Sequence, residues 1–188
     1  MTEAKLREKL YGWRVRSGPL ALLAVAAVAA PTVRSLLIGA AVAVLGLAVR
    51  AWAAGHIHKE RTLARTGPYR HSRNPLYFGN FLLGLGVAVA TNSWWGALVF
   101  ALYFALFYPH VILEERKRMR RFFPEQYGDY EKSVPLFFPR LKPAPGRGGE
   151  RFRWSQYLRN KEYRALLGAV LVWLILTAKM LFLPHLHP

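Results

Sequence analysis

The sequence contains no cysteine and only 10 acidic residues among its 188. The absence of cysteine excludes disulfide frameworks, thiolate metal sites and cysteine nucleophiles. Zinc-ligand spacings, RNA-binding motifs, helix-turn-helix patterns and internal repeats are also missing. Residues 1–17 lack the cleavage pattern of a secretory signal peptide. We expect them to form a basic amphipathic lead-in, with Tyr11 and Trp13 at a membrane interface.

What the sequence does contain is 53% hydrophobic residues together with a formal net charge of +17. So much apolar sequence excludes a disordered chain, which requires low hydrophobicity. The pattern predicts an all-α polytopic membrane bundle with five transmembrane helices. The first apolar run is short, because a crossing needs about 20 residues, and one kinked helix over the first two runs is the alternative. The five runs are 19–33, 35–55, 75–90, 94–113 and 164–184.

The distribution of basic residues predicts the orientation of these runs. With a cytoplasmic N-terminus, 25 of the 27 Lys and Arg residues fall in cytoplasmic segments, and only Arg34 and Lys179 lie near the opposite face. The charges therefore flank spans, where they attract anionic lipid head groups, and we expect no nucleic-acid partner. Residues 151–163 are basic and aromatic, which predicts an interfacial helix before the fifth span. The oligomeric state stays open.

Two polar clusters adjoin the third and fourth runs on the predicted cytoplasmic side. The first is residues 67–79 (Gly-Pro-Tyr-Arg-His-Ser-Arg-Asn-Pro-Leu-Tyr-Phe-Gly), and the second begins at Glu114. A three-residue turn at 91–93 joins the two runs, so we expect them to be antiparallel neighbours. The plainer interpretation is a solvated helix end with weak local ion pairs. The residues expected to meet are Arg73, Asn74, Tyr77, Glu114 and Glu115.

These clusters belong to a longer series of motifs that resembles a known family. The series is Leu63…Gly67-Pro-Tyr69…Arg73-Asn-Pro-Leu-Tyr77-Phe-Gly79, Glu114-Glu115, Phe123-Pro-Glu-Gln-Tyr127-Gly-Asp-Tyr130 and Val134-Pro-Leu-Phe-Phe-Pro139. It is similar to the signature of the isoprenylcysteine carboxyl methyltransferases and the related phospholipid methyltransferases, which are integral-membrane enzymes. The resemblance covers about 60–140 and implies a single domain over 1–188, with 151–184 outside the diagnostic part. Where the eukaryotic enzymes usually have Arg-His-Pro, this chain has Asn74, which cannot titrate near neutrality.

The resemblance implies S-adenosylmethionine as the cofactor, held at the cytoplasmic helix ends. Glu114 or Glu115 suits its cationic or hydroxyl groups, Arg73 or Arg70 its carboxylate, and Tyr77 or Tyr69 a ring face. A soluble Rossmann methyltransferase is excluded, since no strand-borne G-x-G-x-x-G is present. The expected catalytic residues are Arg73, Glu114 and Glu115. The expected cofactor-binding residues are Tyr69, Arg70, Arg73, Asn74, Tyr77, Gly79, Glu114, Glu115 and Tyr127.

The predicted reaction is methyl transfer to a lipid-like or amphipathic acceptor, in the inner membrane of a bacterium or archaeon, with the active site facing the cytoplasm. A carboxylate acceptor of the isoprenylcysteine type needs no base, whereas an amine needs one, for which a Glu is the candidate. The alternatives are a phospholipid N-methyltransferase, an NADPH-dependent sterol-type reductase and a non-catalytic lipid-binding protein. No metal is expected at His56-Ile-His58, because residues two apart face apart on a helix. His185 and His187 are expected at the surface.

Overall fold

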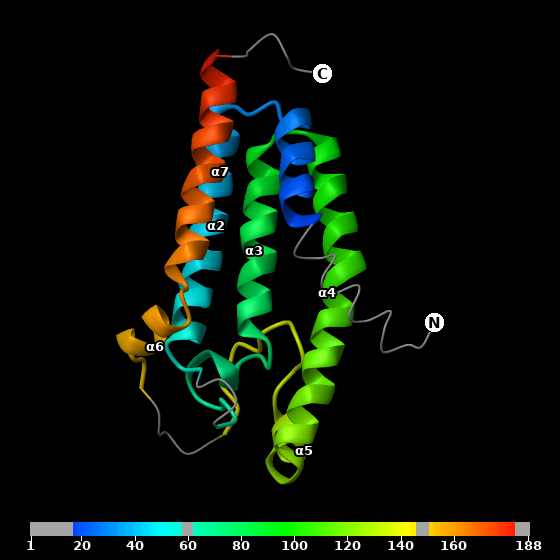
Figure 1. Cartoon of the computed structure of the whole chain (residues 1–188), viewed down its shortest axis with the longest axis vertical. Helices are drawn as coiled ribbons and strands as arrows, with labels where there is room; N and C mark the ends of the chain where they lie inside the picture. Colours follow the sequence, from blue (N-terminus) through cyan, green and yellow to red (C-terminus); the bar gives the residue numbers. More distant parts are fainter. Residues whose placement is uncertain (1–16, 58–61, 146–150, 183–188) are drawn as a thin grey trace. The chain divides into compact units, whose positions relative to one another are not determined.

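The computed structural model of the chain describes residues 17–57, 62–145 and 151–182, and within these ranges it is helical, without a strand (Figure 1). The predicted all-α class is therefore confirmed for this part of the chain. Tyr11, Trp13, His58, His185 and His187 lie outside the described residues. The helices are Ser17–Val28, α2 (Val33–Ala54), the 3-10 helix η1 (Gly67–Arg70), α3 (Pro75–Ala90), α4 (Trp94–Phe122), α5 (Pro124–Ser133), α6 (Trp154–Arg159) and α7 (Tyr163–Phe182).

The five apolar runs all become helices, although their boundaries differ from those predicted. The first two are separate helices with a non-helical link at 29–32, so the single long helix is wrong. Helix α4 does not end near Glu114 but passes through Pro109 and continues to Phe122, because Glu, Lys, Arg and Met are good helix formers. It ends where Pro124 opens α5, since the residue before a proline is disfavoured in helical conformation.

Three helices are long and apolar enough to cross a membrane: α2, α4 and α7. Helix α3 has 16 residues, or about 24 Å, which is less than the ~30 Å hydrocarbon core. Helix Ser17–Val28 is also short. The interfacial helix expected over 151–163 is reduced to the six residues of α6. The structure thus supports three membrane spans by length and composition, and the five-span arrangement stays a prediction.

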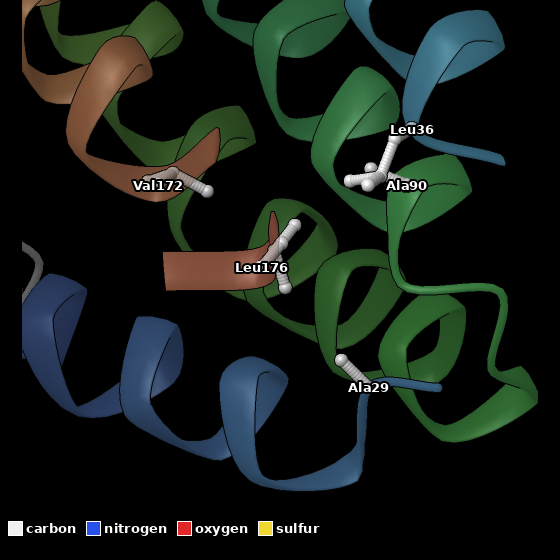
Figure 2. Packing of buried hydrophobic residues seen from close by; sticks show 5 residues of the cluster. All are labelled: Ala29, Leu36, Ala90, Val172 and Leu176. Atoms are coloured by element: carbon white, nitrogen blue, oxygen red, sulfur yellow. The ribbon is translucent and has the colours of Figure 1, made fainter. Parts of the chain in front are cut away.

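The described chain divides into two compact units. The first comprises the described residues of 17–43, 84–113 and 169–182. Helices α2 and α3 approach closely here, because a side chain at Gly39 would lie 2.4 Å from the carbonyl oxygen of Gly86. Small residues of this kind allow helix backbones to pack directly, as is common in membranes. Figure 2 shows the apolar core of this unit, to which α7 contributes Val172 and Leu176.

Hydrogen bonds connect the two links between helices in this unit, residues 29–32 and 91–93. Ala30 donates its backbone N–H to Thr91 (2.7 Å), and the Ser35 hydroxyl donates to the Ala90 carbonyl (3.1 Å). The Lys179 ammonium donates to the carbonyls of Ala26 (3.0 Å) and Ala27 (2.6 Å), which a helix end leaves without partners. These bonds satisfy backbone groups at the links between helices.

The second unit comprises the described residues of 44–83 and 114–168. A close approach of α2 and α3 recurs in it, since a side chain at Gly79 would meet Arg50 at 2.5 Å and the Gly46 carbonyl at 2.8 Å. Its apolar core is the cluster of Tyr127, Tyr130, Val134 and Ala144. All of the residues predicted from the sequence to form the site belong to this unit.

Candidate functional site

The stretch after η1 is fastened to residues 134–144 by a series of hydrogen bonds. Arg73 N–H donates to Pro135 O (2.9 Å), Asn74 Nδ2 to Leu136 O (2.9 Å), and Ser72 Oγ to Phe137 O (2.7 Å). Arg140 N–H donates to His71 O (2.9 Å), and Ala144 N–H to Arg70 O (2.9 Å). Two sequence motifs about 60–70 residues apart are therefore joined by both backbone and side-chain hydrogen bonds.

Helix α5 completes the site, and the sequence analysis missed it. Pro124 occupies its first turn, where a proline is well tolerated. Tyr127 and Tyr130 are buried along it and Val134 is buried directly after it, at spacings of three and four residues. The Tyr130 hydroxyl donates to the Tyr69 carbonyl (2.7 Å), which attaches α5 to η1. The Phe-Pro-Glu start and this spacing were the signals that would have identified the helix.

The centre of the site is a carboxylate held by three arginines. Glu131 accepts from Arg73 (2.9 Å) and from Arg120 (3.0 and 2.7 Å), and it also pairs with Arg116. The Arg73 side chain is 8% exposed and also reaches the Tyr127 hydroxyl (3.5 Å). Its guanidinium lies 5.9 Å from the centre of the Tyr127 ring. The sequence predicts a Glu114 or Glu115 carboxylate near Arg73, whereas the ion-pair partner of Arg73 is Glu131 of α5.

The three arginines change the acidity of Glu131. Partial burial opposes its ionisation, but hydrogen bonds from Arg120 and Arg73 and the charges of Arg73 and Arg116 outweigh this effect. The pKa of Glu131 falls from 4.5 to about 2. The carboxylate is therefore ionised at neutral pH and is a poor proton acceptor. Its role is to orient the arginines.

Several buried polar atoms of this unit have no hydrogen-bond partner among the described residues. They are the Tyr69 hydroxyl, Arg73 Nε, Arg116 Nε and Thr66 Oγ1. Burial raises the pKa of Tyr69 far above its usual value, with further contributions from Tyr130 and the charges of Glu115 and Glu162, so the phenol remains an O–H donor. An unpaired buried polar group costs about 1–3 kcal/mol. Such donors are suited to a bound ligand.

The two acidic residues of α4 differ in their surroundings. Glu114 lies 3.2 Å from Lys117, and both side chains are close to half exposed. Glu115 is half-buried, and its charge acts on the Tyr69 hydroxyl, as does the phenol of half-buried Tyr77. Of the two predicted glutamates, Glu115 is therefore the one whose charge acts on an unpartnered donor, the Tyr69 hydroxyl.

The remaining predicted residues have structural partners. Arg70 Nε donates to the Ala144 carbonyl (2.8 Å), and the Asn74 amide is occupied by Leu136. Gly79 lies against Arg50 and Gly46 of α2, so a larger residue at this position would clash with that helix. These contacts indicate that Arg70, Asn74 and Gly79 stabilise the backbone around the site.

The end of α2 supports the same stretch. Buried His56 binds the Trp52 carbonyl through Nδ1 (2.9 Å), and its ring occupies the space beside Gly67. Gly67 has a φ of +55°, which favours glycine. No group of three His, Asp or Glu that would hold a metal ion occurs within the described ranges.

The fold and the site define an all-helical integral membrane protein in which Arg73, the end of α4 and helix α5 form a cluster of arginines around the Glu131 carboxylate. The phospholipid methyltransferase family profile matches residues 24–126, more than half of the chain. The chain belongs to this family. The resemblance inferred from the motifs at 60–140 is confirmed.

Curated relatives of the chain include two bacterial metal-resistance proteins and a mammalian methyltransferase. A cobalt-zinc-cadmium resistance protein of Cupriavidus metallidurans is 38% identical over 126 residues, 66% of this chain and 56% of that protein. A nickel-cobalt-cadmium resistance protein of Alcaligenes xylosoxydans xylosoxydans is 42% identical over 107 residues, 56% of this chain and 48% of that protein. Protein-S-isoprenylcysteine O-methyltransferase of Mus musculus is 35% identical over 81 residues, 43% of this chain and 29% of that enzyme.

The chain spans about half the length of the two bacterial relatives that it matches. No solved structure matches it.

Proposed function

We propose that this protein is an S-adenosylmethionine-dependent methyltransferase that acts on a lipid-like or amphipathic acceptor. The family and the similarity to an isoprenylcysteine methyltransferase support the class of reaction. One structural observation carries the proposal. The Tyr69 hydroxyl, Arg73 Nε and Arg116 Nε are buried donors without partners among the described residues, and they belong to or directly follow the motifs that resemble that class of enzyme.

The chemistry of these residues fits a zwitterionic cofactor. Arg73 and Arg116 present N–H donors suited to a carboxylate, and Glu131 fixes both guanidinium groups. Glu115 supplies negative charge beside Tyr69, which suits a cationic group. When bound, S-adenosylmethionine supplies an electrophilic methyl group on a sulfonium. The protein's contribution is positioning, which provides much of the acceleration in reactions of this kind.

The proposed acceptor is an amphipathic carboxylate of the isoprenylcysteine type. Such an acceptor is ionised at pH 7, so no general base is needed, and Glu131 with its low pKa is unsuited to be one. An amine head group, as in a phospholipid N-methyltransferase, is the second candidate. Glu115 favours it, because the arginine cluster is paired with Glu131 and the charge of Glu115 acts on the Tyr69 hydroxyl.

Binding to the purified full chain tests the proposal directly. We expect calorimetry to show binding of S-adenosylmethionine. We expect it to show no binding of NADPH, the cofactor of a sterol-type reductase. Tyr69→Phe removes a donor that is unpaired in the free protein, so it is expected to leave thermal stability unchanged or higher while weakening cofactor binding about tenfold. Equal affinity in Tyr69→Phe and the wild type would sink the assignment of this site.

The membrane arrangement that we propose has five spans, a cytoplasmic N-terminus and a site facing the cytoplasm of a bacterial or archaeal inner membrane. This arrangement assigns 25 of the 27 Lys and Arg residues to the cytoplasmic side, where they would attract anionic lipids, and this asymmetry supports it. Because the chain has no cysteine, single cysteines introduced at Asn92 and Lys142 report sidedness without background. An impermeant thiol reagent is expected to label only position 92 from outside intact cells; labelling of only position 142 contradicts the orientation.

A further inference from the structure

A second buried ion pair occurs in the same unit, away from the Glu131 cluster. Arg50 of α2 donates through Nε to Glu162 at 2.5 Å, and also to the Asn80 side-chain oxygen of α3. The side chains of Arg50 and Glu162 are only 16% and 8% exposed. Such a pair adds little net stability, because desolvation offsets the attraction between the charges. Another role therefore has to account for it.

The backbone around Glu162 is arranged to bring its carboxylate inward. Lys161 adopts φ +54°, a conformation uncommon outside glycine, at the reversal between α6 and α7. Asn160 Nδ2 donates to the Ala54 carbonyl (2.9 Å), and Arg153 N–H donates to the Gly55 carbonyl (3.0 Å). The chain from α6 to α7 is thus fastened to the end of α2, with Glu162 directed at Arg50.

The position of Asn80 connects this pair to the candidate cofactor site. Asn80 and Tyr77 are three residues apart on α3 and therefore share one face of that helix. The charge of Glu162 also acts on the buried Tyr69 hydroxyl, to which Tyr77 and Glu115 contribute as well. Two carboxylates, Glu115 and Glu162, thus act on one unpartnered donor, whereas the arginines gather around Glu131.

We propose that Glu162 is a further binding residue for the cofactor and selects its sulfonium cation through the negative charge of the carboxylate. This inference rests on the proposed function. Glu162 lies beyond residues 24–126, the part matched by the family, so the family match does not point to it. Arg50 and Asn80 position the carboxylate, and Gly79 leaves room for the Arg50 side chain.

A comparison of two ligands tests the inference without any methyl acceptor. S-adenosylhomocysteine lacks the methyl group and the sulfonium charge but is otherwise the same molecule as the cofactor. In the full-length protein, calorimetry should show that Glu162→Gln lowers the ratio of S-adenosylmethionine to S-adenosylhomocysteine affinity about tenfold, which is ~1.4 kcal/mol. Glu162→Asp keeps the charge and is expected to retain the wild-type ratio.

Glu125→Gln is the matched control, because it makes the same substitution at an exposed carboxylate of α5 in the same unit. If the charge of Glu162 selects the cation, the ratio stays at the wild-type value in Glu125→Gln. If Glu162→Gln alone fails to fold, the double variant with Arg50→Gln removes both charges, and the tenfold fall is expected there.

Two results overturn the inference while leaving the proposed function intact. One is an equal loss of affinity for both ligands in Glu162→Gln, which indicates a structural role. The other is an unchanged ratio. A wild-type protein that binds neither ligand overturns the proposed function, and this inference with it.

Discussion

Helices α2 and α3 each contribute to both units of the protein, but the side chains around them differ between the two units. In the first unit, α2 and α3 meet through Gly39 and Gly86, and the core consists of alanine, valine and leucine side chains. In the second, the same two helices meet through Gly46 and Gly79, but the neighbouring side chains form ion pairs around Glu131 and Glu162. Backbone packing is common to both, and among the described residues the ion pairs between mostly buried side chains, Arg50–Glu162 and Arg73–Glu131, lie in the second unit. Such charge is costly in an apolar setting, which indicates a functional requirement.

The largest expected effect comes from removing the central arginine of the second unit. Arg73→Ala deletes the N–H donors proposed for the cofactor carboxylate and one partner of Glu131, so we expect S-adenosylmethionine affinity to fall at least ~100-fold, or about 2.7 kcal/mol. Calorimetry measures the loss. Lys132→Ala, at an exposed cation of α5, is the control and should bind normally. Comparable losses in the two variants would contradict a specific role for Arg73.

A glycine substitution in the first unit should affect stability without affecting ligand selectivity. A methyl group at Gly86 would lie 2.7 Å from the Gly39 carbonyl, so Gly86→Ala is expected to destabilise the protein by about 1–3 kcal/mol. Gly168→Ala, where nothing lies within 4 Å, is the matched control and should gain up to about 1 kcal/mol of helix stability. Thermal unfolding in detergent compares them. Equal Tm values for Gly86→Ala and Gly168→Ala would show that the close approach of α2 and α3 does not limit stability.

A smaller effect is expected for the pH dependence of the arginine cluster. The pKa of Glu131 is lowered from 4.5 to about 2, so its ion pairs stabilise the fold fully above pH 4.5 and are lost as the pH falls toward 2. Glu131→Gln should remove this part of the acid sensitivity. Thermal unfolding from pH 6 to pH 2 measures it, and parallel curves for the variant and the wild type would refute the assignment.

The smallest effect is expected at Asn74. Asn74→Ala loses the hydrogen bond to the Leu136 carbonyl, which is expected to cost about 1 kcal/mol of stability. Because the amide is occupied by the backbone, we expect cofactor affinity to change less than threefold once the protein is folded. A loss as large as that of Arg73→Ala would instead assign Asn74 to the cofactor, as the sequence analysis had expected.

Much of the site was predictable from local patterns, and its pairings were not. The motif from Gly67 to Gly79 and the Glu114-Glu115 pair indicated the family and the right part of the molecule. Sequence reasoning did not find that Arg73 pairs with Glu131, because a Tyr- and Glu-containing segment after Pro124 resembles a polar loop. No sequence pattern indicated a role for Glu162, because a single acidic residue before an apolar helix is common.

The sequence by itself determined the all-helical class, the apolar helices and the family, because these depend on hydropathy over long runs and on ordered local motifs. Only the tertiary structure decided which charges meet. Residues 73, 116, 120 and 131 come from three elements, and their distances depend on how the turns bring those elements together. Among the described residues, the tertiary fold also leaves the Tyr69 hydroxyl and two arginine nitrogens buried without hydrogen-bond partners, which no linear pattern records. A hydrogen bond depends on distance in space, and sequence separation carries little information about that distance.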